Sequence, residues 1–274
     1  MEIKFENVSF NNVVKDINLK IEKGQIIGIV GSSGSGKTTL VEMIDALVLP
    51  TNGRLLVGDF ALEKGKKYKN INELRFNVGF VFEDANEQIF SNTVYDEVAF
   101  AMRYFKYKKE QIEVQVKKAL MMVGLPEEYL YKNPFNLSHG ETKKLAIACV
   151  LAFNPEIVIF DEPLTALDNA SKKNLIKIIR TLKTRYNKTV IIVSQDTDFL
   201  HKIVDKVYVM HKGNIVMAGN KYEVFQEEEL LNKYDVKAPS VISFAKLVEK
   251  KKGIKMGYRD EINDLIKDVY RYVK

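Results

Sequence analysis

Residues 31–39 read GSSGSGKTT and stand directly after the apolar run QIIGIV and directly before an amphipathic stretch from residue 37 to about 48. This stretch satisfies the pattern G-x-x-x-x-G-K-[ST] in the strand-then-helix context that a phosphate-binding loop requires. Gly31, Gly34 and Gly36 let the main chain curl so that its N–H groups point inward, and the helix N-terminus adds its positive end. The fold must therefore contain a strand that leads through this loop into a helix.

The side chains of the loop extend the prediction to a nucleotide and its metal ion. Lys37 can reach the β- and γ-phosphates of ATP, and the Thr38 hydroxyl is placed to ligate Mg²⁺. The alternative is a glycine-rich turn that binds nothing. The residues expected to contact the nucleotide are Gly31, Ser32, Ser33, Gly34, Ser35, Gly36, Lys37, Thr38 and Thr39.

A second motif, EIVIFDE at residues 156–162, complements the loop. Its apolar residues predict a buried strand, and Asp161 at the strand end can hold the magnesium ion directly or through water. Glu162 points elsewhere and can polarise an attacking water. Strands often end in acidic residues, so the motif gains its meaning from the phosphate loop upstream.

The order of the remaining segments predicts the architecture. Short strands fill the first 30 residues, helical spacing runs from about 85 to 153, and strands then alternate with helices until about 219. Such alternation predicts a parallel sheet covered by helices. We therefore expect an α/β P-loop NTPase fold over 1–219, with a mainly parallel central sheet, an N-terminal antiparallel β subdomain, an inserted helical subdomain and a C-terminal helical extension at 220–274.

Composition narrows the class of protein further. A hydrophobic content of 46% over 274 residues supports a well-buried core, and no uninterrupted apolar stretch approaches the ~20 residues that cross a bilayer. The first residues, MEIKFENVSF, show neither a basic leader nor an apolar signal core, so we expect an intracellular chain unless something holds it at a membrane. Cys149 is interpreted as a small buried residue. The basic clusters, such as KGKKYK, are either solvated or contact an anionic partner.

Residues 137–168, LSHGETKKLAIACVLAFNPEIVIFDEPLTALD, resemble the nucleotide-binding subunits of ATP-binding cassette (ABC) transporters, whose signature LSGGQ precedes the second acidic motif. The resemblance extends from residue 1 to about 220. Within that family, VGFVFEDANEQIFSNTVYDEVAFAM at 78–102 is most similar to the ATPases of energy-coupling factor (ECF) importers of vitamins and metal ions, including the cobalt/nickel type.

The resemblance implies a dimer of ATPase subunits that sandwiches two ATP molecules. Ser138, Gly140 and Glu141 would then offer hydroxyl and N–H groups to the γ-phosphate held by the other subunit, and Leu167 and Asp168 would touch the partner. A capped helix start explains Ser138 and Glu141 equally well, and both interpretations can hold together. The C-terminal region at 220–274 would help to pair the two subunits.

The same resemblance implies membrane partners. A transmembrane coupling subunit would dock on residues 83–105, where Val98, Phe100, Met102 and Phe105 either receive its helix or form the core of the helical subdomain. We therefore expect a peripheral ATPase on the cytoplasmic face of the cell membrane that energises an ECF importer of a vitamin or transition-metal ion, with a separate substrate-binding membrane protein and no nucleic acid. The alternatives are a non-transport cassette protein and a regulatory nucleotide-binding module with weak hydrolysis.

Several positions depart from the family pattern. Glu83 replaces the usual glutamine, His139 and Glu141 alter the signature, and Phe10 is the nearest candidate for the aromatic residue that stacks on adenine. Gln195 stands after the strand VIIVS, where the family has a histidine.

Two of these departures bear on catalysis. Glu83 can still ligate magnesium, whereas the neutral amide of Gln195 carries no proton or charge to the γ-phosphate. We therefore hypothesise that this chain's own site binds ATP well, hydrolyses it slowly with Glu162 as the base, and works beside a second, different ATPase subunit. A homodimer, or a substitution at residue 195 with little kinetic effect, is the alternative.

Overall fold

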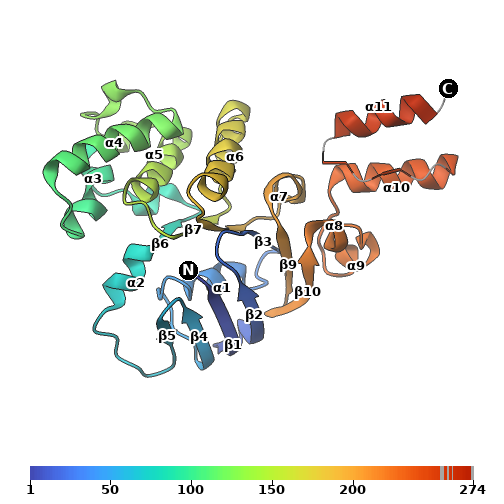
Figure 1. Cartoon of the computed structure of the whole chain (residues 1–274), viewed down its shortest axis with the longest axis horizontal. Helices are drawn as coiled ribbons and strands as arrows, with labels where there is room; N and C mark the ends of the chain where they lie inside the picture. Colours follow the sequence, from blue (N-terminus) through green and yellow to red (C-terminus); the bar gives the residue numbers. More distant parts are fainter. Residues whose placement is uncertain (254–255, 258, 261, 273–274) are drawn as a thin grey trace.

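The computed structural model describes residues 1–253, 256–257, 259–260 and 262–272, and it is an α/β fold built on two sheets (Figure 1). The larger sheet has the strand order β10-β9-β3-β8-β7-β6, in which β9 and β10 pair antiparallel and the other neighbours pair parallel. Its strands are β3 (Ile26–Val30), β6 (Val78–Val81), β7 (Ile157–Asp161), β8 (Thr189–Val193), β9 (Lys206–His211) and β10 (Asn214–Asn220).

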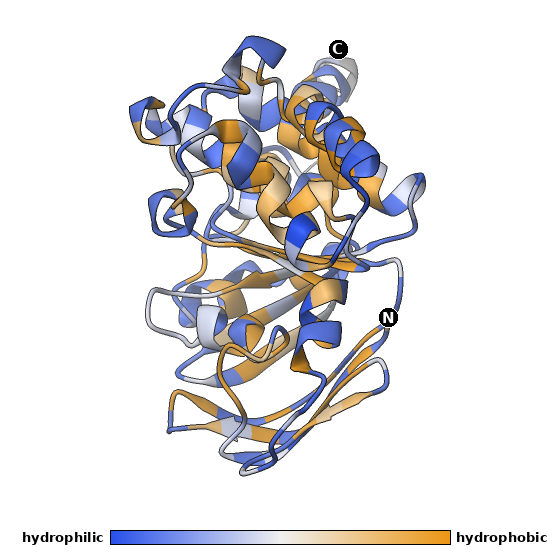
Figure 2. Cartoon of the chain, turned by 90° about the vertical axis from the view of Figure 1, so that its left-hand side faces the viewer, coloured by the Kyte–Doolittle hydropathy of each residue, from blue (hydrophilic) through white to orange (hydrophobic). Residues whose placement is uncertain are grey.

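Hydrophobic side chains cover both faces of this sheet. Every residue of β3, β7 and β8 is buried, which is why these strands read as continuous apolar runs rather than as alternating ones. Alternate residues divide between two cores: Val158 and Phe160 face the helical insertion, whereas Ile157 and Ile159 face the N-terminal sheet. In Figure 2 these apolar segments run through the middle of the molecule. The sheet is therefore a rigid base for residues at its strand ends.

The smaller sheet is antiparallel, as the sequence predicts, with the order β2-β1-β4-β5. It comprises β1 (Ile3–Phe10), β2 (Val14–Ile21), β4 (Asn52–Val57) and β5 (Phe60–Leu62), and it shares a core with α1 (Lys37–Glu42). The helix predicted from 37 to about 48 is too long. It ends at Glu42, because the chain then turns and Ala46 takes a φ of 51°, outside the helical range.

Helices between β6 and β7 form the insertion at the left of Figure 1. Helix α2 (Ile71–Asn77) comes before β6. The insertion itself contains α3 (Val94–Tyr104), α4 (Lys109–Val123) and α5 (His139–Ala152), with 3-10 turns at Ala85–Gln88, Glu127–Tyr129 and Pro134–Asn136. Of the two interpretations given for the apolar residues at 98–105, the core holds for Val98 and Met102 and docking does not. Val98 and Met102 are fully buried in the core and cannot receive a partner, Phe105 packs against that core, and Phe100 is exposed.

The C-terminal region is helical and packs on α7 (Thr197–Ile203), the helix that follows β8 and precedes β9. It contains α8 (Lys221–Val224), α9 (Glu228–Lys233), α10 (Ser240–Lys252) and α11 (Ile262–Tyr272). Asp198 on α7 accepts hydrogen bonds from the Ser240 N–H at 2.7 Å and from its hydroxyl at 2.6 Å. The side chain of Asp198 thus caps α10 from another helix. The expected dimerisation region, 220–274, also includes residues outside the described ones.

Helix α6 (Asn169–Thr184) connects β7 to β8, which pair in parallel. Among the described residues, no helix combines the length and the apolar character that crossing a membrane requires.

Candidate nucleotide site

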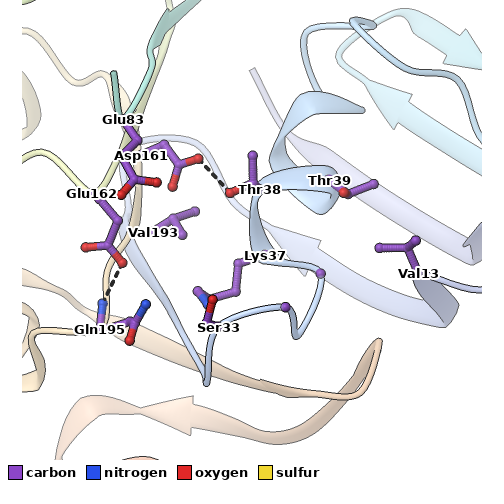
Figure 3. Close-up of a pocket in the computed structure, with 12 residues that line it drawn as sticks. Val13, Ser33, Lys37, Thr38, Thr39, Glu83, Asp161, Glu162, Val193 and Gln195 are labelled. Carbon is purple, nitrogen blue, oxygen red and sulfur yellow. Dashed lines mark hydrogen bonds between the residues drawn. The ribbon is translucent and has the colours of Figure 1, made fainter. Parts of the chain in front are cut away.

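One cavity lies at the carboxyl ends of the parallel strands β3, β8, β7 and β6 (Figure 3). It has a volume of about 210 Å³ and is lined by the phosphate loop, the ends of three strands and Val13. In open parallel sheets the carboxyl ends of the strands are where ligands bind. The structure therefore brings Lys37, Thr38, Asp161, Glu162 and Gln195 together, although they are widely separated in the sequence.

The phosphate loop keeps its shape through close contacts that only glycine allows. A Cβ atom on Gly31 would lie 2.2 Å from the Met210 carbonyl oxygen, and one on Gly36, whose φ is 98°, would lie 2.8 Å from the Val13 carbonyl oxygen. The hairpin between β9 and β10 supports the loop from outside, because the Gly213 N–H donates to the Ser35 carbonyl at 3.0 Å. The loop is therefore pre-formed, as anion binding by main-chain N–H groups requires.

Lys37 lies inside its own loop. Its Nζ donates to the carbonyl oxygens of Gly31 and Ser32, both at 2.9 Å. Burial lowers the pKa of the Lys37 ammonium, while the carboxylates of Glu162 and Asp161 act to raise it. The ammonium lines the cavity and can exchange a carbonyl partner for a phosphate oxygen with little movement.

Thr38 and Asp161 form an oxygen-rich corner that fits a magnesium ion. The Thr38 hydroxyl donates to Asp161 Oδ2 at 2.7 Å, whereas Asp161 Oδ1 is buried and accepts no hydrogen bond from the described residues. Burial raises the pKa of Asp161 against the lowering effect of the Thr38 hydrogen bond. A buried carboxylate oxygen without a partner is costly, and a bound cation removes that cost. Glu83 lines the same cavity and adds a third oxygen donor of the kind that Mg²⁺ prefers.

Glu162 is held by two hydrogen bonds in a strained main-chain conformation. Its φ is 39°, which is unfavourable for a residue other than glycine and tends to occur where function requires it. Oε2 accepts from the Ser194 hydroxyl at 3.1 Å and Oε1 from the Gln195 main-chain N–H at 2.9 Å, the latter drawn in Figure 3. Burial raises the pKa of Glu162, although both hydrogen bonds lower it. A raised pKa brings a carboxylate nearer to the range suited to proton transfer.

Sequence reasoning did not identify Ser194, which is 1% exposed and also accepts a hydrogen bond from the Asp196 N–H. Its signal is the serine that ends VIIVS, one residue before Gln195. Gln195 plays two roles: its side chain lines the cavity, and its main chain positions Glu162. The second role does not depend on the identity of the side chain.

The signature segment lies outside this cavity, at the start of α5. The Ser138 hydroxyl donates to Glu141 Oε2 at 2.7 Å, the Tyr129 hydroxyl donates to Glu141 Oε1 at 2.5 Å, and the expected capping box is present. These hydrogen bonds, with that of Tyr129 the strongest, lower the pKa of Glu141 to about 2. The segment therefore carries a negative charge at the helix start. The contact of Ser138, Gly140 and Glu141 with a partner's ATP stays a prediction.

Phe10 does not line the cavity. It ends β1 and packs against the core of the N-terminal sheet, and Val13, in the turn that follows, supplies the apolar wall near the phosphate loop. The structure therefore lends no support to Phe10 as the residue that stacks on adenine.

Comparison with known proteins agrees with this geometry. The family model described as ABC transporter matches residues 14–165. The energy-coupling factor transporter ATP-binding protein EcfA2 of Enterococcus faecalis is 37% identical over 260 residues, which cover 91% of this chain and 90% of that protein. EcfA2 of Bacillus subtilis is 34% identical, with 93% and 91% of the two chains covered.

Two solved structures share the fold. CbiO1 of Clostridium perfringens, described as part of the ABC transporter complex CbiONQ, superposes with a TM-score of 0.73 at 31% identity and covers 89% of this chain and 98% of its own. A dimer of the ATP-binding cassette MJ0796 bound to ADP and Pi also superposes with a TM-score of 0.73, at 27% identity, and covers 80% and 98% of the two chains.

Fold and site together define an ABC-type ATPase. More narrowly, the chain belongs to the family of ATP-binding proteins of energy-coupling factor transporters within the ABC transporters.

Proposed function

We propose that the chain is the ATP-hydrolysing subunit of an ECF-type importer and that it works in a dimer of ATPases on a transmembrane coupling subunit. The observation that carries the proposal is the meeting of Lys37, the Thr38–Asp161 pair and a clamped Glu162 in one cavity. The names of the EcfA2 relatives and of the CbiO1 complex support the transport role. The vitamin or transition-metal cargo would be selected by a separate membrane protein, and the site would lie at the cytoplasmic face of the membrane.

The side chains suggest how hydrolysis proceeds. The loop N–H groups and Lys37 bind the β- and γ-phosphates, and Thr38, Asp161 and Glu83 would hold Mg²⁺. When bound, Mg²⁺ neutralises the charge that develops on the phosphate oxygens. Glu162, fixed by Ser194 and the Gln195 N–H, orients the attacking water and accepts its proton. Positioned general bases contribute roughly 10²–10⁴-fold to a rate.

Two features support an asymmetric pair of ATPases. Gln195 presents a neutral amide to the cavity where the family has histidine, so less positive charge faces the γ-phosphate at this chain's own site. Glu141 places a carboxylate in the segment that would face the partner's nucleotide. Both features would slow hydrolysis. They therefore also favour a second candidate function, a regulatory nucleotide-binding module with weak ATP turnover.

An exposed aromatic group on the helical insertion suits a membrane partner. Phe90 and Phe100 pack edge to face with ring centroids 4.7 Å apart, and they stay 58% and 49% exposed. Tyr104, on the same helix as Phe100, is also exposed. This group replaces the buried Val98 and Met102 as the surface that would dock on the coupling subunit.

The test is to isolate the tagged chain from membranes and to measure ATP hydrolysis in whatever complex is recovered. We expect an integral membrane subunit and a second ATPase to co-purify, and Glu162→Gln to lower turnover at this chain's site by roughly a hundredfold without loss of ATP binding. Recovery without a membrane protein would contradict the transport role. Unchanged turnover with Glu162→Gln, in a complex whose other ATPase subunit is inactivated, would contradict the role of Glu162 as the base.

A further inference from the structure

Lys143 is the most unusual buried residue that the mechanism above does not use. It lies on α5, five positions after the Ser138 cap, and is only 2% exposed, whereas lysine side chains usually reach solvent. Its Nζ donates to two consecutive carbonyl oxygens, those of Phe82 and Glu83, both at 2.8 Å. Burial lowers the pKa of the Lys143 ammonium to about 8, although Asp161 and Glu83 act in the opposite direction.

The two carbonyl groups belong to the segment that leaves β6 for the helical insertion. The strand ends at Val81, so the main chain of Phe82 and Glu83 has no neighbouring strand among its partners. Side chains supply hydrogen bonds in place of a strand, since Gln88 accepts from the Phe82 N–H at 3.2 Å and donates to the Phe80 carbonyl at 3.1 Å. Lys143 holds the carbonyl groups of the same segment from α5.

The position of Glu83 depends on this segment. Its side chain lines the nucleotide cavity and its carboxylate accepts no hydrogen bond from the described residues, so the main chain is what places Glu83 at the cavity wall. Glu83 also lines a neighbouring cavity of about 340 Å³ together with Lys143 and His139. Lys143 therefore connects α5, on which it lies, to Glu83, which lines the nucleotide cavity with Thr38 and Asp161.

We propose that Lys143 is a positioning residue that fixes the main chain of Phe82 and Glu83 from α5 and thereby keeps Glu83 at the wall of the nucleotide cavity. Because Lys143 and the signature segment share one helix, a shift of α5 moves Glu83 with it. This inference rests on the proposed function for its second readout, Mg²⁺-dependent ATP binding, but its first readout needs neither nucleotide nor metal.

The first experiment is amide hydrogen exchange on the full chain without nucleotide. In Lys143→Met the long apolar stem remains and the donors are lost, so we expect exchange across residues 82–88 to become at least about tenfold faster. Lys143→Arg keeps donors at the same place and should restore protection. The matched control is Lys188→Met: Lys188 is 5% exposed and donates to the Asn154 carbonyl and the Glu156 carboxylate, at the opposite end of the sheet. This control should leave exchange at 82–88 unchanged.

The second experiment measures binding of a fluorescent ATP analogue with and without Mg²⁺. We expect Lys143→Met to leave metal-free binding within about twofold and to reduce the gain from Mg²⁺ about tenfold. In a Glu83→Gln background, Lys143→Met should cost little more, because both changes affect one interaction.

The outcomes separate the two hypotheses. Unchanged exchange at 82–88 in Lys143→Met, or an undiminished loss of Mg²⁺ dependence in the Glu83→Gln background, overturns the positioning role. Absence of ATP binding by the unmodified chain overturns the proposed function instead, and the exchange experiment still decides the role of Lys143. If Lys143→Met does not fold, Lys143→Gln removes the charge and retains an NH2 donor group on a shorter side chain, and intermediate exchange is then expected.

Discussion

Removing the Ser194 hydroxyl tests whether Glu162 is held in place for catalysis. Ser194 and the Gln195 N–H are the donors to the Glu162 carboxylate, at 3.1 and 2.9 Å, and Ser194 is 1% exposed. A hydrogen bond to a charged group is worth about 1.5–3 kcal/mol. If most of that energy serves to orient the base, Ser194→Ala lowers kcat by roughly 10- to 100-fold. KM should change little, because the phosphate loop remains intact.

The pH profile gives the same test a second readout. Burial already raises the pKa of Glu162, and the Ser194 hydroxyl counteracts that rise. Without the hydroxyl the pKa rises further, so a larger fraction of the base is protonated at mildly acidic pH. The acidic limb of kcat should therefore move to higher pH in Ser194→Ala, and Ser194→Cys, with its weak donor, should fall between the two.

The assay is steady-state ATP hydrolysis by the assembled complex, measured from acidic to neutral pH. Thr189→Val is the matched control, because Thr189 lies at the other end of β8, is fully buried and accepts from the Gly24 N–H at 3.1 Å. This control should cost stability, about 1 kcal/mol, without a change in the pH profile. If kcat and the acidic limb of the pH profile were the same in Ser194→Ala and in the unmodified complex, the claim that Ser194 orients Glu162 for catalysis would be refuted.

Three further predictions concern Asp45, Gln195 and Asp198. Burial raises the pKa of Asp45 from 3.8 to about 7, so the folded state binds a proton more tightly than the unfolded state. The free energy of unfolding therefore falls as the pH rises from about 4 to 7. Asp45→Asn should recover up to about 4 kcal/mol of that free energy above pH 7 and little near pH 4, and urea unfolding at both pH values measures the difference. Gln195→His should raise ATP turnover in the complex, and no gain would contradict the hypothesis that this chain's own site hydrolyses ATP slowly because of Gln195. Asp198→Ala should uncap α10 at a cost of about 1 kcal/mol and speed hydrogen exchange in its first turn, whereas protection equal to that of the unmodified chain would show that Ser240 needs no cap.

Local motifs made much of the fold and of the nucleotide cavity predictable. The phosphate loop and the strand ending in Asp161 and Glu162 each combine a short sequence pattern with the residue types that the chemistry needs. The apolar runs of β3, β7 and β8 predicted buried parallel strands, because such strands are covered on both faces. Glu83 was found because it follows a buried strand at a family motif.

Contacts through space were not predictable in the same way. Nothing in the sequence says that Lys143 turns inward, because the sequence pattern of α5 does not distinguish a buried lysine from a solvated one. Phe10 was chosen by its type and its place in the chain, yet at the end of β1 it is partly buried and packs against the N-terminal core. Val98 and Met102 show the same limit, since an apolar helix face fits a core and a docking surface equally well.

The charges around the cavity explain why ATP and a metal ion would have to bind together. Asp161, Glu162 and Glu83 line it with acidic groups, Lys37 is the basic side chain of the lining, and Lys143 lies behind Glu83. ATP adds several negative charges to a site where burial already raises the pKa of Asp161 and Glu162. A divalent cation at the unpartnered Asp161 Oδ1 would offset both the carboxylates and the phosphates. Because the cation would also favour the ionised form of Glu162, the fraction of Glu162 able to accept a proton should rise when the metal binds.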